Sequence, residues 1–212
     1  AVNFIDGLDG LAVGVVAIAS GCFFSFSYLL AVSNGFTRAG APSLMTVILI
    51  GLCIGFLPHN SNPARMFMGD SGSMLLGLIL AASAITLTGQ IDANAISEEN
   101  IGPALLPLFL PFAVLAIPLL DLGLAILRRT SSGKSPFAPD KLHLHHRLLA
   151  SGNSQNRAAI VLYLWTATFA VPVTVAAFAP IWIAILLTIF LAATAFYTAK
   201  RTLDRNGNLI NV

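Results

Sequence analysis

Charged residues are what this sequence most lacks. Of its 212 residues only 9% are Asp, Glu, Lys or Arg, whereas 57% are hydrophobic. A water-soluble globular domain carries about 25% charged residues. The deficit excludes an ordinary soluble domain. We therefore interpret the chain as an integral membrane protein, and we expect no nucleic-acid partner.

Cysteine is also scarce. Cys22 and Cys53 are the only two, and both fall within apolar stretches. Two isolated cysteines in such surroundings form neither a disulfide framework nor a CxxC metal motif. We expect both to be small, buried hydrophobic side chains. Internal repeats, heptad patterns and low-complexity tracts are absent from the sequence as well.

Long apolar runs dominate the chain instead. A membrane-spanning helix needs about 20 mainly apolar residues. Six segments approach that length, at residues 11–32, 42–57, 72–89, 104–127, 158–178 and 181–199. The predicted fold is therefore an all-α, polytopic bundle of about six transmembrane helices, which forms a single domain over residues 1–212.

Basic residues are distributed unevenly among the loops between these segments. Six spans put both termini on one side of the membrane, together with the loops at 59–71 and 128–157. Of the eleven Lys and Arg residues, only Arg38 falls in the opposite set of loops. The positive-inside rule assigns the basic set to the cytoplasm. We therefore predict a multi-pass protein of the inner (plasma) membrane, with a cytoplasmic histidine loop at 128–158.

Three groups of reactive side chains fall on this predicted cytoplasmic side. The first, in VNFIDGLDGLAVG, places Asn3, Asp6 and Asp9 among glycines just before an apolar run. The second runs from Asn60 to Ser73 and ends in GDSGS, which places Asp70 at the start of an apolar helix, where an Asp can simply cap the helix. Oxygen donors that share one membrane face can instead bind a hard divalent cation, which keeps ligand positions for a substrate phosphate.

The third group is DKLHLHHR, in which His143, His145 and His146 are followed by Arg147. The HxHH spacing matches no familiar zinc site. Histidine and arginine can bind phosphate oxygens through charge-assisted hydrogen bonds. A solvated basic loop near anionic lipid is the alternative interpretation.

Two other ionisable residues are less informative. Asp121 falls inside the fourth span, where a buried acid is usually functional. Its place near the cytoplasmic end is equally compatible with pairing to a neighbouring helix. His59 is a lone loop histidine, and we expect no role for it.

Taken in this order, the three groups resemble one known family. NFIDGLDGLA, NPARMFMGDSGSMLLG, PLLDLGLAILRR and DKLHLHHRLL are similar to segments of the polyprenyl-phosphate N-acetylhexosamine-1-phosphate transferases, bacterial glycosyltransferase family 4. That family transfers a sugar 1-phosphate from a UDP-sugar to membrane-bound polyprenyl phosphate, releases UMP, and uses Mg²⁺ or Mn²⁺. The resemblance implies such an enzyme, acting at the first membrane step of cell-envelope polysaccharide synthesis. Family analogy alone implies a homodimer.

The resemblance also implies a role for each matching residue. Asp70 would be the principal metal ligand with Asn3 beside it, and Asp6 would arrange the region of the metal and diphosphate. Asp9 would lie near the uracil, and Phe67 would stack on that base. The residues that would hold phosphates are His143, His145, His146 and Arg147.

The choice of sugar rests on the same motifs. HxHH followed by Arg-Leu-Leu, together with NPARMFMGDSGS, is closer to the branch that uses UDP-N-acetylglucosamine. The peptidoglycan branch, which uses UDP-N-acetylmuramoyl-pentapeptide, more often has consecutive histidines and is the alternative. A transporter or membrane scaffold is a second alternative, although a transporter would place its ionisable residues near the bilayer midplane. A zinc metallohydrolase acting through the histidines is a third.

In one respect the chain departs from the family. Family members have further spans and an Asp-Asp pair in an earlier cytoplasmic loop, and this sequence has neither that pair nor a starting Met. We therefore expect a fragment that lacks the first spans and is inactive by itself.

Overall fold

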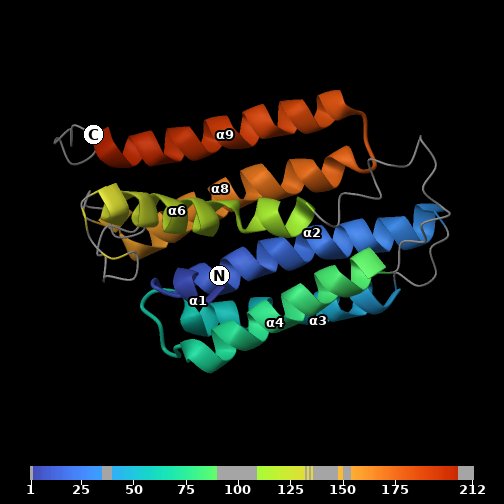
Figure 1. Cartoon of the computed structure of the whole chain (residues 1–212), viewed down its shortest axis with the longest axis horizontal. Coiled ribbons are helices and arrows are strands. Elements are labelled where there is room, and N and C mark those ends of the chain that lie inside the picture. The colour runs from blue at the N-terminus through green and yellow to red at the C-terminus, as the bar shows by residue number, and fades with distance from the viewer. Residues whose placement is uncertain are drawn as a thin grey trace.

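The computed structural model describes residues 2–34, 40–89, 109–131, 133, 135, 148–149 and 154–204 (Figure 1). Throughout these residues the regular structure is helical. The helices are α1 (Val2–Ile5), α2 (Leu11–Asn34), α3 (Gly40–Asn60), α4 (Gly69–Gly89), α6 (Ala116–Ser131), α8 (Gln155–Ala176) and α9 (Ile181–Asp204). A further helical stretch covers residues 109–114.

Five of the described helices are long and apolar enough to cross a membrane. They are Leu11–Val32, Gly40–Asn60, Gly69–Gly89, Gln155–Ala176 and Ile181–Ala199. Each overlaps one of the predicted spans. The all-α membrane bundle that the apolar runs predicted is therefore confirmed.

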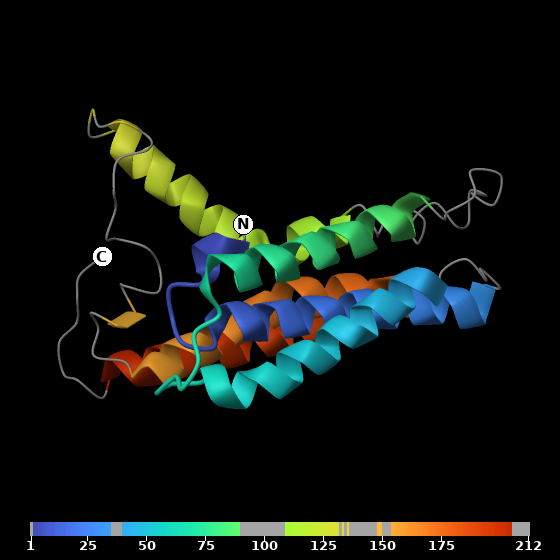
Figure 2. The same cartoon turned by 90° about the horizontal axis from the view of Figure 1, so that it is seen from below.

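The predicted span at 104–127 is not one continuous helix in the residues that are described. The helical stretch 109–114 ends in a turn at Leu115, and α6 begins at the next residue. Proline has no backbone N–H, so Pro118 cannot donate to the carbonyl of Val114, and the helical ladder is interrupted there. Beyond the break, α6 projects away from the bundle (Figure 2). The sequence prediction counted apolar residues and overlooked this proline.

Helix α2 is the centre of the bundle. Phe23 and Phe26 of α2 are fully buried in one cluster with Leu49 of α3, Leu87 of α4 and Ala170 of α8. Helix α9, in contrast, packs on α8 and leaves most of its apolar side chains exposed. A helix that is apolar all round is stable only in a core or against lipid. The exposure of α9 therefore fits a helix that faces the bilayer.

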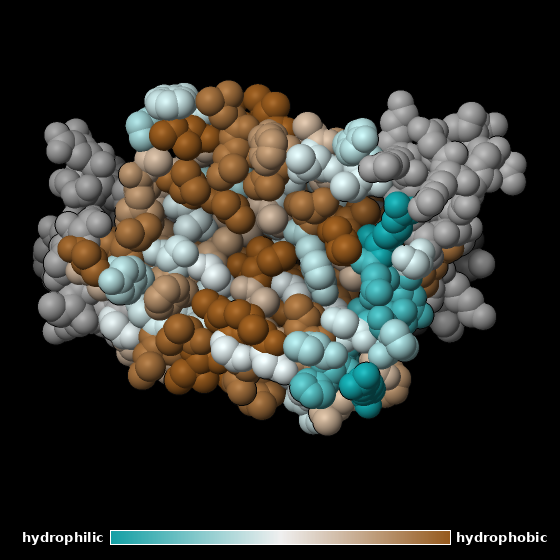
Figure 3. All heavy atoms as spheres, turned by 180° about the vertical axis from the view of Figure 1, so that it is seen from behind, coloured by the Kyte–Doolittle hydropathy of each residue, from teal (hydrophilic) through white to brown (hydrophobic). Residues whose placement is uncertain are grey.

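One end of the bundle is polar. Figure 1 shows the turn at 6–10, the loop at 61–68 and the start of α8 together at the left-hand end, whereas the turn between α8 and α9 lies at the right. In the view from behind, hydrophilic side chains gather at the same end (Figure 3). We call this region, made of 6–10, 61–68 and the first turns of α4 and α8, the polar end.

Candidate functional site at the polar end

Two carboxylates from distant parts of the sequence meet at the polar end. Asp6 lies in the turn between α1 and α2, and Asp70 lies in the first turn of α4. Burial raises the pKa of the Asp6 carboxyl above its ordinary value, and the negative charge of Asp70 raises it further. Two carboxylates that repel one another in this way provide a favourable place for a cation.

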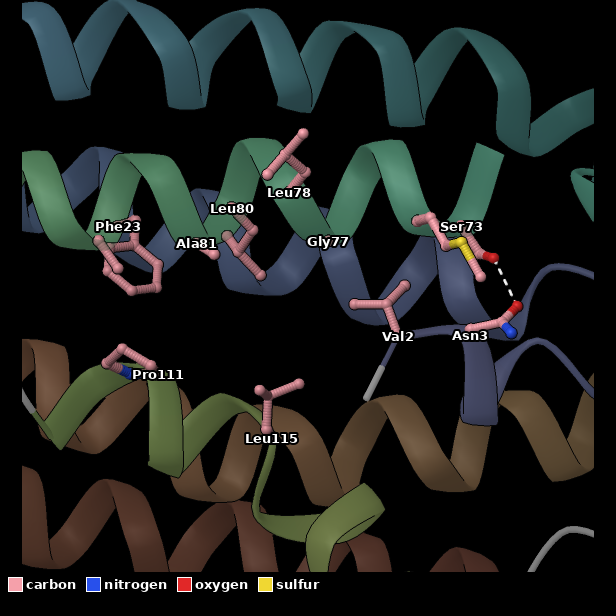
Figure 4. Close-up of a pocket in the computed structure, with 12 residues that line it drawn as sticks. Val2, Asn3, Phe23, Ser73, Gly77, Leu78, Leu80, Ala81, Pro111 and Leu115 are labelled. Carbon is pink, nitrogen blue, oxygen red and sulfur yellow. Dashed lines mark hydrogen bonds between the residues drawn. The ribbon is translucent and has the colours of Figure 1, made fainter. Parts of the chain in front are cut away.

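Asn3 is tied to the same helix turn as Asp70. The Ser73 hydroxyl donates to Asn3 Oδ1 at 2.7 Å (Figure 4). It also lies 3.1 Å from the backbone carbonyl of Asp70, which accepts from it. Ser73 is completely buried, so this contact fixes α1 against the start of α4. The three acceptor residues that the sequence predicted, Asn3, Asp6 and Asp70, are therefore brought to one place.

An apolar groove begins at the Asn3–Ser73 contact. It has a volume of about 420 Å³ and runs along α4 toward the middle of the bundle (Figure 4). Apart from those two residues its walls are almost entirely apolar. They are formed by Val2, Phe23, Met74, Gly77, Leu78, Leu80, Ala81, Ala84, Pro111 and Leu115. One end of the groove is thus formed by Asn3 and Ser73, and Ser73 is bonded to the backbone of Asp70.

Asp9 has structural partners of its own. Its Oδ2 accepts hydrogen bonds from Asn62 Nδ2 at 2.8 Å and from the backbone N–H of Ala64 at 3.2 Å. Asn62 Nδ2 also donates to Gln155 Oε1 at 2.7 Å, at the start of α8. Asp9 therefore joins the 6–10 turn, the 61–68 loop and α8. One of its two carboxylate oxygens is left without such a partner among the described contacts.

Phe67 stands out from the loop that leads into α4. Its side chain is 77% exposed, which is high for a large aromatic residue. A cavity of about 370 Å³ lies beside it, between α2, α3 and α4, with Met66 and Met68 in its lining. An aromatic face in this position is available to stack on a planar group.

The predicted phosphate-binding residues His143, His145, His146 and Arg147 lie outside the described residues. Leu148 and Leu149, which follow Arg147 directly in the sequence, are described. Both pack against a buried cluster that includes Ile5 and Leu8 of the acidic segment. Asp121 belongs to α6, and its side chain is also outside the description. His59 contributes a backbone carbonyl, which accepts from the N–H groups of Arg65 and Met66.

The donor atoms at the polar end suit a particular kind of metal ion. Within the described residues there is no group of three or more His, Cys, Asp or Glu side chains that could hold a metal. Two carboxylates and an amide oxygen do not make a closed protein cage. They do fit Mg²⁺, which is usually held by one or two carboxylates together with water and substrate phosphates.

Sequence reasoning assigned no role to four polar residues of this region. They are Asn60, Asn62, Gln155 and Tyr163. Asn60 is only 3% exposed, and its two hydrogen bonds connect Gly10 to the backbone of Met66. The two asparagines belong to the second group of reactive side chains that the sequence predicted, but nothing in the sequence around the other two distinguishes them from ordinary helix residues.

These features define a helical membrane protein with a carboxylate site at one end of its bundle. Residues 1–88 match the family model described as glycosyl transferase family 4. Over 167 residues the chain is 49% identical to the decaprenyl-phosphate N-acetylglucosaminephosphotransferase of Mycobacterium tuberculosis. It is 35% identical over 187 residues to a probable undecaprenyl-phosphate N-acetylglucosaminyl 1-phosphate transferase of Bacillus subtilis. The chain therefore belongs to glycosyl transferase family 4.

A relative from a second branch is also similar. The phospho-N-acetylmuramoyl-pentapeptide-transferase of Staphylococcus saprophyticus is 34% identical over 166 residues. The three alignments cover 78%, 88% and 78% of this chain but only 41%, 47% and 44% of the relatives. The chain thus spans less than half the length of the curated relatives it matches.

Proposed function

We propose that the protein transfers N-acetylglucosamine 1-phosphate from UDP-N-acetylglucosamine to a polyprenyl phosphate in the membrane and releases UMP. The reaction brings two phosphorylated substrates together, and one of them is a lipid. The observation that carries the proposal is the Asp6–Asp70 pair close to an apolar groove, whose polar end is lined by Asn3 and by Ser73 in the same helix turn as Asp70. A cation site for phosphates and a channel for a prenyl chain are the two elements that this reaction needs.

The proposed catalysis is electrostatic. Bound Mg²⁺ or Mn²⁺ would neutralise the diphosphate and the departing UMP, as is usual in phosphoryl transfer. Asp70 would hold the ion, with Asn3 and Asp6 beside it. Because these groups are fixed by α1 and the first turn of α4, little reorganisation is required during the reaction.

The other predicted residues would orient the substrates. Phe67 would stack on the uracil, which its exposure allows. Asp9 would use its second oxygen toward the nucleotide while its first holds the 61–68 loop. The phosphates would be bound by His143, His145, His146 and Arg147. The packing of Leu148 and Leu149 against the acidic segment supports this assignment.

We further propose that the polar end faces the cytoplasm, where nucleotide sugars are available, and that the membrane is the inner one. The distribution of basic residues supports this orientation. The polar end also argues against a transporter, because Asp6, Asp9 and Asp70 lie at one end of the bundle rather than halfway along it. The homodimer stays a prediction from family analogy.

The donor is tested by UMP release from the full-length protein in polyprenyl phosphate micelles. We expect release with UDP-N-acetylglucosamine and little with UDP-N-acetylmuramoyl-pentapeptide. The 49% identity to an N-acetylglucosamine-phosphate transferase, against 34% to the pentapeptide enzyme, favours the first donor. The reverse preference would assign the protein to the peptidoglycan branch. Activity retained under a zinc-selective chelator would exclude a zinc hydrolase.

A further inference from the structure

The backbone of Gly10 makes hydrogen bonds to distant side chains through both its N–H group and its carbonyl. Its N–H donates to Asn60 Oδ1 at 3.1 Å, in a buried hydrogen bond. Its carbonyl accepts from the hydroxyl of Tyr163 on α8, 153 positions further along the chain. Gly10 has a φ of +77°, a conformation that favours glycine, and directly precedes α2. The turn that carries Asp6 and Asp9 therefore ends at a residue whose backbone is fixed by Asn60 and Tyr163.

Asn60 also binds the loop that leads to Asp70. Asn60 uses its amide nitrogen to donate to the backbone carbonyl of Met66 at 2.9 Å. Asp6 lies four residues before Gly10, and Asp70 lies four residues after Met66. One asparagine thus connects the two segments that bring the carboxylates together, and Tyr163 fixes the glycine on which this connection depends.

Helix α2 is shaped to let Tyr163 reach its partner. A Cβ atom on Gly14 would overlap the Tyr163 ring, so the ring lies directly against the α2 backbone. A Cβ on Gly10 would meet the Tyr163 hydroxyl at 3.3 Å. Tyrosine suits this place because its ring is apolar while its hydroxyl can bond a buried carbonyl. The contact is therefore specific to a tyrosine against glycines.

We propose that Tyr163 is a positioning residue that sets the separation of Asp6 and Asp70, and with it the affinity of the polar end for a divalent cation. The inference rests on the proposed function, since it assumes that these carboxylates hold the ion. Tyr163 does not itself touch the ion or the substrates. It acts through Gly10 and Asn60.

The test is Tyr163→Phe in the full-length protein, which removes only the hydroxyl. Free Mn²⁺ is counted by electron paramagnetic resonance in the presence of UDP-N-acetylglucosamine, so that the readout is binding rather than turnover. We expect Mn²⁺ affinity to fall about threefold to tenfold, somewhat less than is typical when a direct partner of a metal ligand is lost. The Mg²⁺ concentration for half-maximal UMP release should rise in parallel.

Tyr197→Phe is the matched control, because Tyr197 lies on α9 and is 65% exposed. Its Mn²⁺ affinity should equal that of the wild type. Equal affinity in Tyr163→Phe, with only a lower yield or melting temperature, would show that the hydroxyl stabilises the bundle and does not position the site. If the wild type binds no Mn²⁺ and releases no UMP, the proposed function itself is wrong, and the inference fails with it.

Discussion

Asp6 is the residue whose ionisation reports most directly on the site. Its pKa is raised above the ordinary value of 3.8 by burial and by Asp70, so the folded protein binds its proton more tightly than the unfolded chain does. The free energy of unfolding of the metal-free protein should therefore decline as the pH rises from 3.8 through the folded-state pKa. Unfolding in detergent with EDTA, followed between pH 4 and pH 8, should detect this decline.

Asp6→Asn should flatten that decline, because the amide does not ionise. Without metal, Asp6→Asn should therefore be more stable than the wild type above the folded-state pKa of Asp6. Added Mg²⁺ with UDP-N-acetylglucosamine should make the wild type the more stable of the two, since ligands that bind only the folded state stabilise it. If the free energy of unfolding depends on pH in the same way in Asp6→Asn and in the wild type, the Asp6 carboxyl is not influenced by burial and by Asp70.

Phe67 offers a second test at a single residue. Stacking of an aromatic ring on a base is worth about 1–3 kcal/mol, so Phe67→Ala should raise the KM for the UDP-sugar about tenfold. Its melting temperature should hardly change, because the ring is largely exposed. Phe190→Ala, on the lipid-facing side of α9, should leave KM unchanged. An unaltered KM in Phe67→Ala would remove the ring from the nucleotide site.

At this scale the sequence predicted the acceptors of the site and missed their supports. Asn3, Asp6 and Asp70 are recognisable because polar groups beside apolar runs are rare. Tyr163 carries no such signal, since its role depends on a contact with Gly10 that only the folded chain creates. Asn60 is hidden for the same reason, as its two partners lie 50 residues and six residues away.

The packing of α2 against α8 is the contact between elements that most affects the polar end. Gly14→Ala would place a methyl group inside the Tyr163 ring, and such overpacking costs about 1–3 kcal/mol. We expect a lower melting temperature and weaker Mn²⁺ binding, because the ring must move away from Gly10.

Gly21→Ala is the control on the same helix. A Cβ at Gly21 meets nothing within 4 Å, and alanine is the better helix former, so stability should be unchanged or slightly higher. Equal melting temperatures for the two alanine variants would contradict the described contact between α2 and Tyr163.

Helix positions were predictable where apolar length decides them. The five spans that agree are long and mainly apolar, and no alternative places so much apolar surface out of water. The fourth predicted span failed at Leu115 because hydropathy does not register the hydrogen bond that Pro118 removes. The alternation of spans predicted that the loops of one side come together at the polar end. It did not predict which residues of those loops touch.

For the whole molecule, family membership and the site agree on one kind of chemistry. The relatives are more than twice as long as the matched segment. The described helices account for a carboxylate pair, an exposed aromatic ring and an apolar groove at one end of the bundle. This arrangement supports the proposed reaction between a charged donor and a lipid acceptor.

The central claim is that Asp70 and Asp6 hold a divalent cation that assists the transfer of a phosphosugar from the UDP-sugar to polyprenyl phosphate. The direct measurement is UMP release by full-length protein and by Asp70→Asn, with UDP-N-acetylglucosamine and polyprenyl phosphate, over a range of Mg²⁺ concentrations. The Asp70 side chain is exposed and asparagine has nearly the same shape, so the variant should fold normally. We predict Mg²⁺-dependent release by the wild type and a loss of at least about 100-fold in Asp70→Asn, in line with loss of an electrostatic catalytic group. Undiminished, Mg²⁺-dependent release by a well-folded Asp70→Asn would contradict the account.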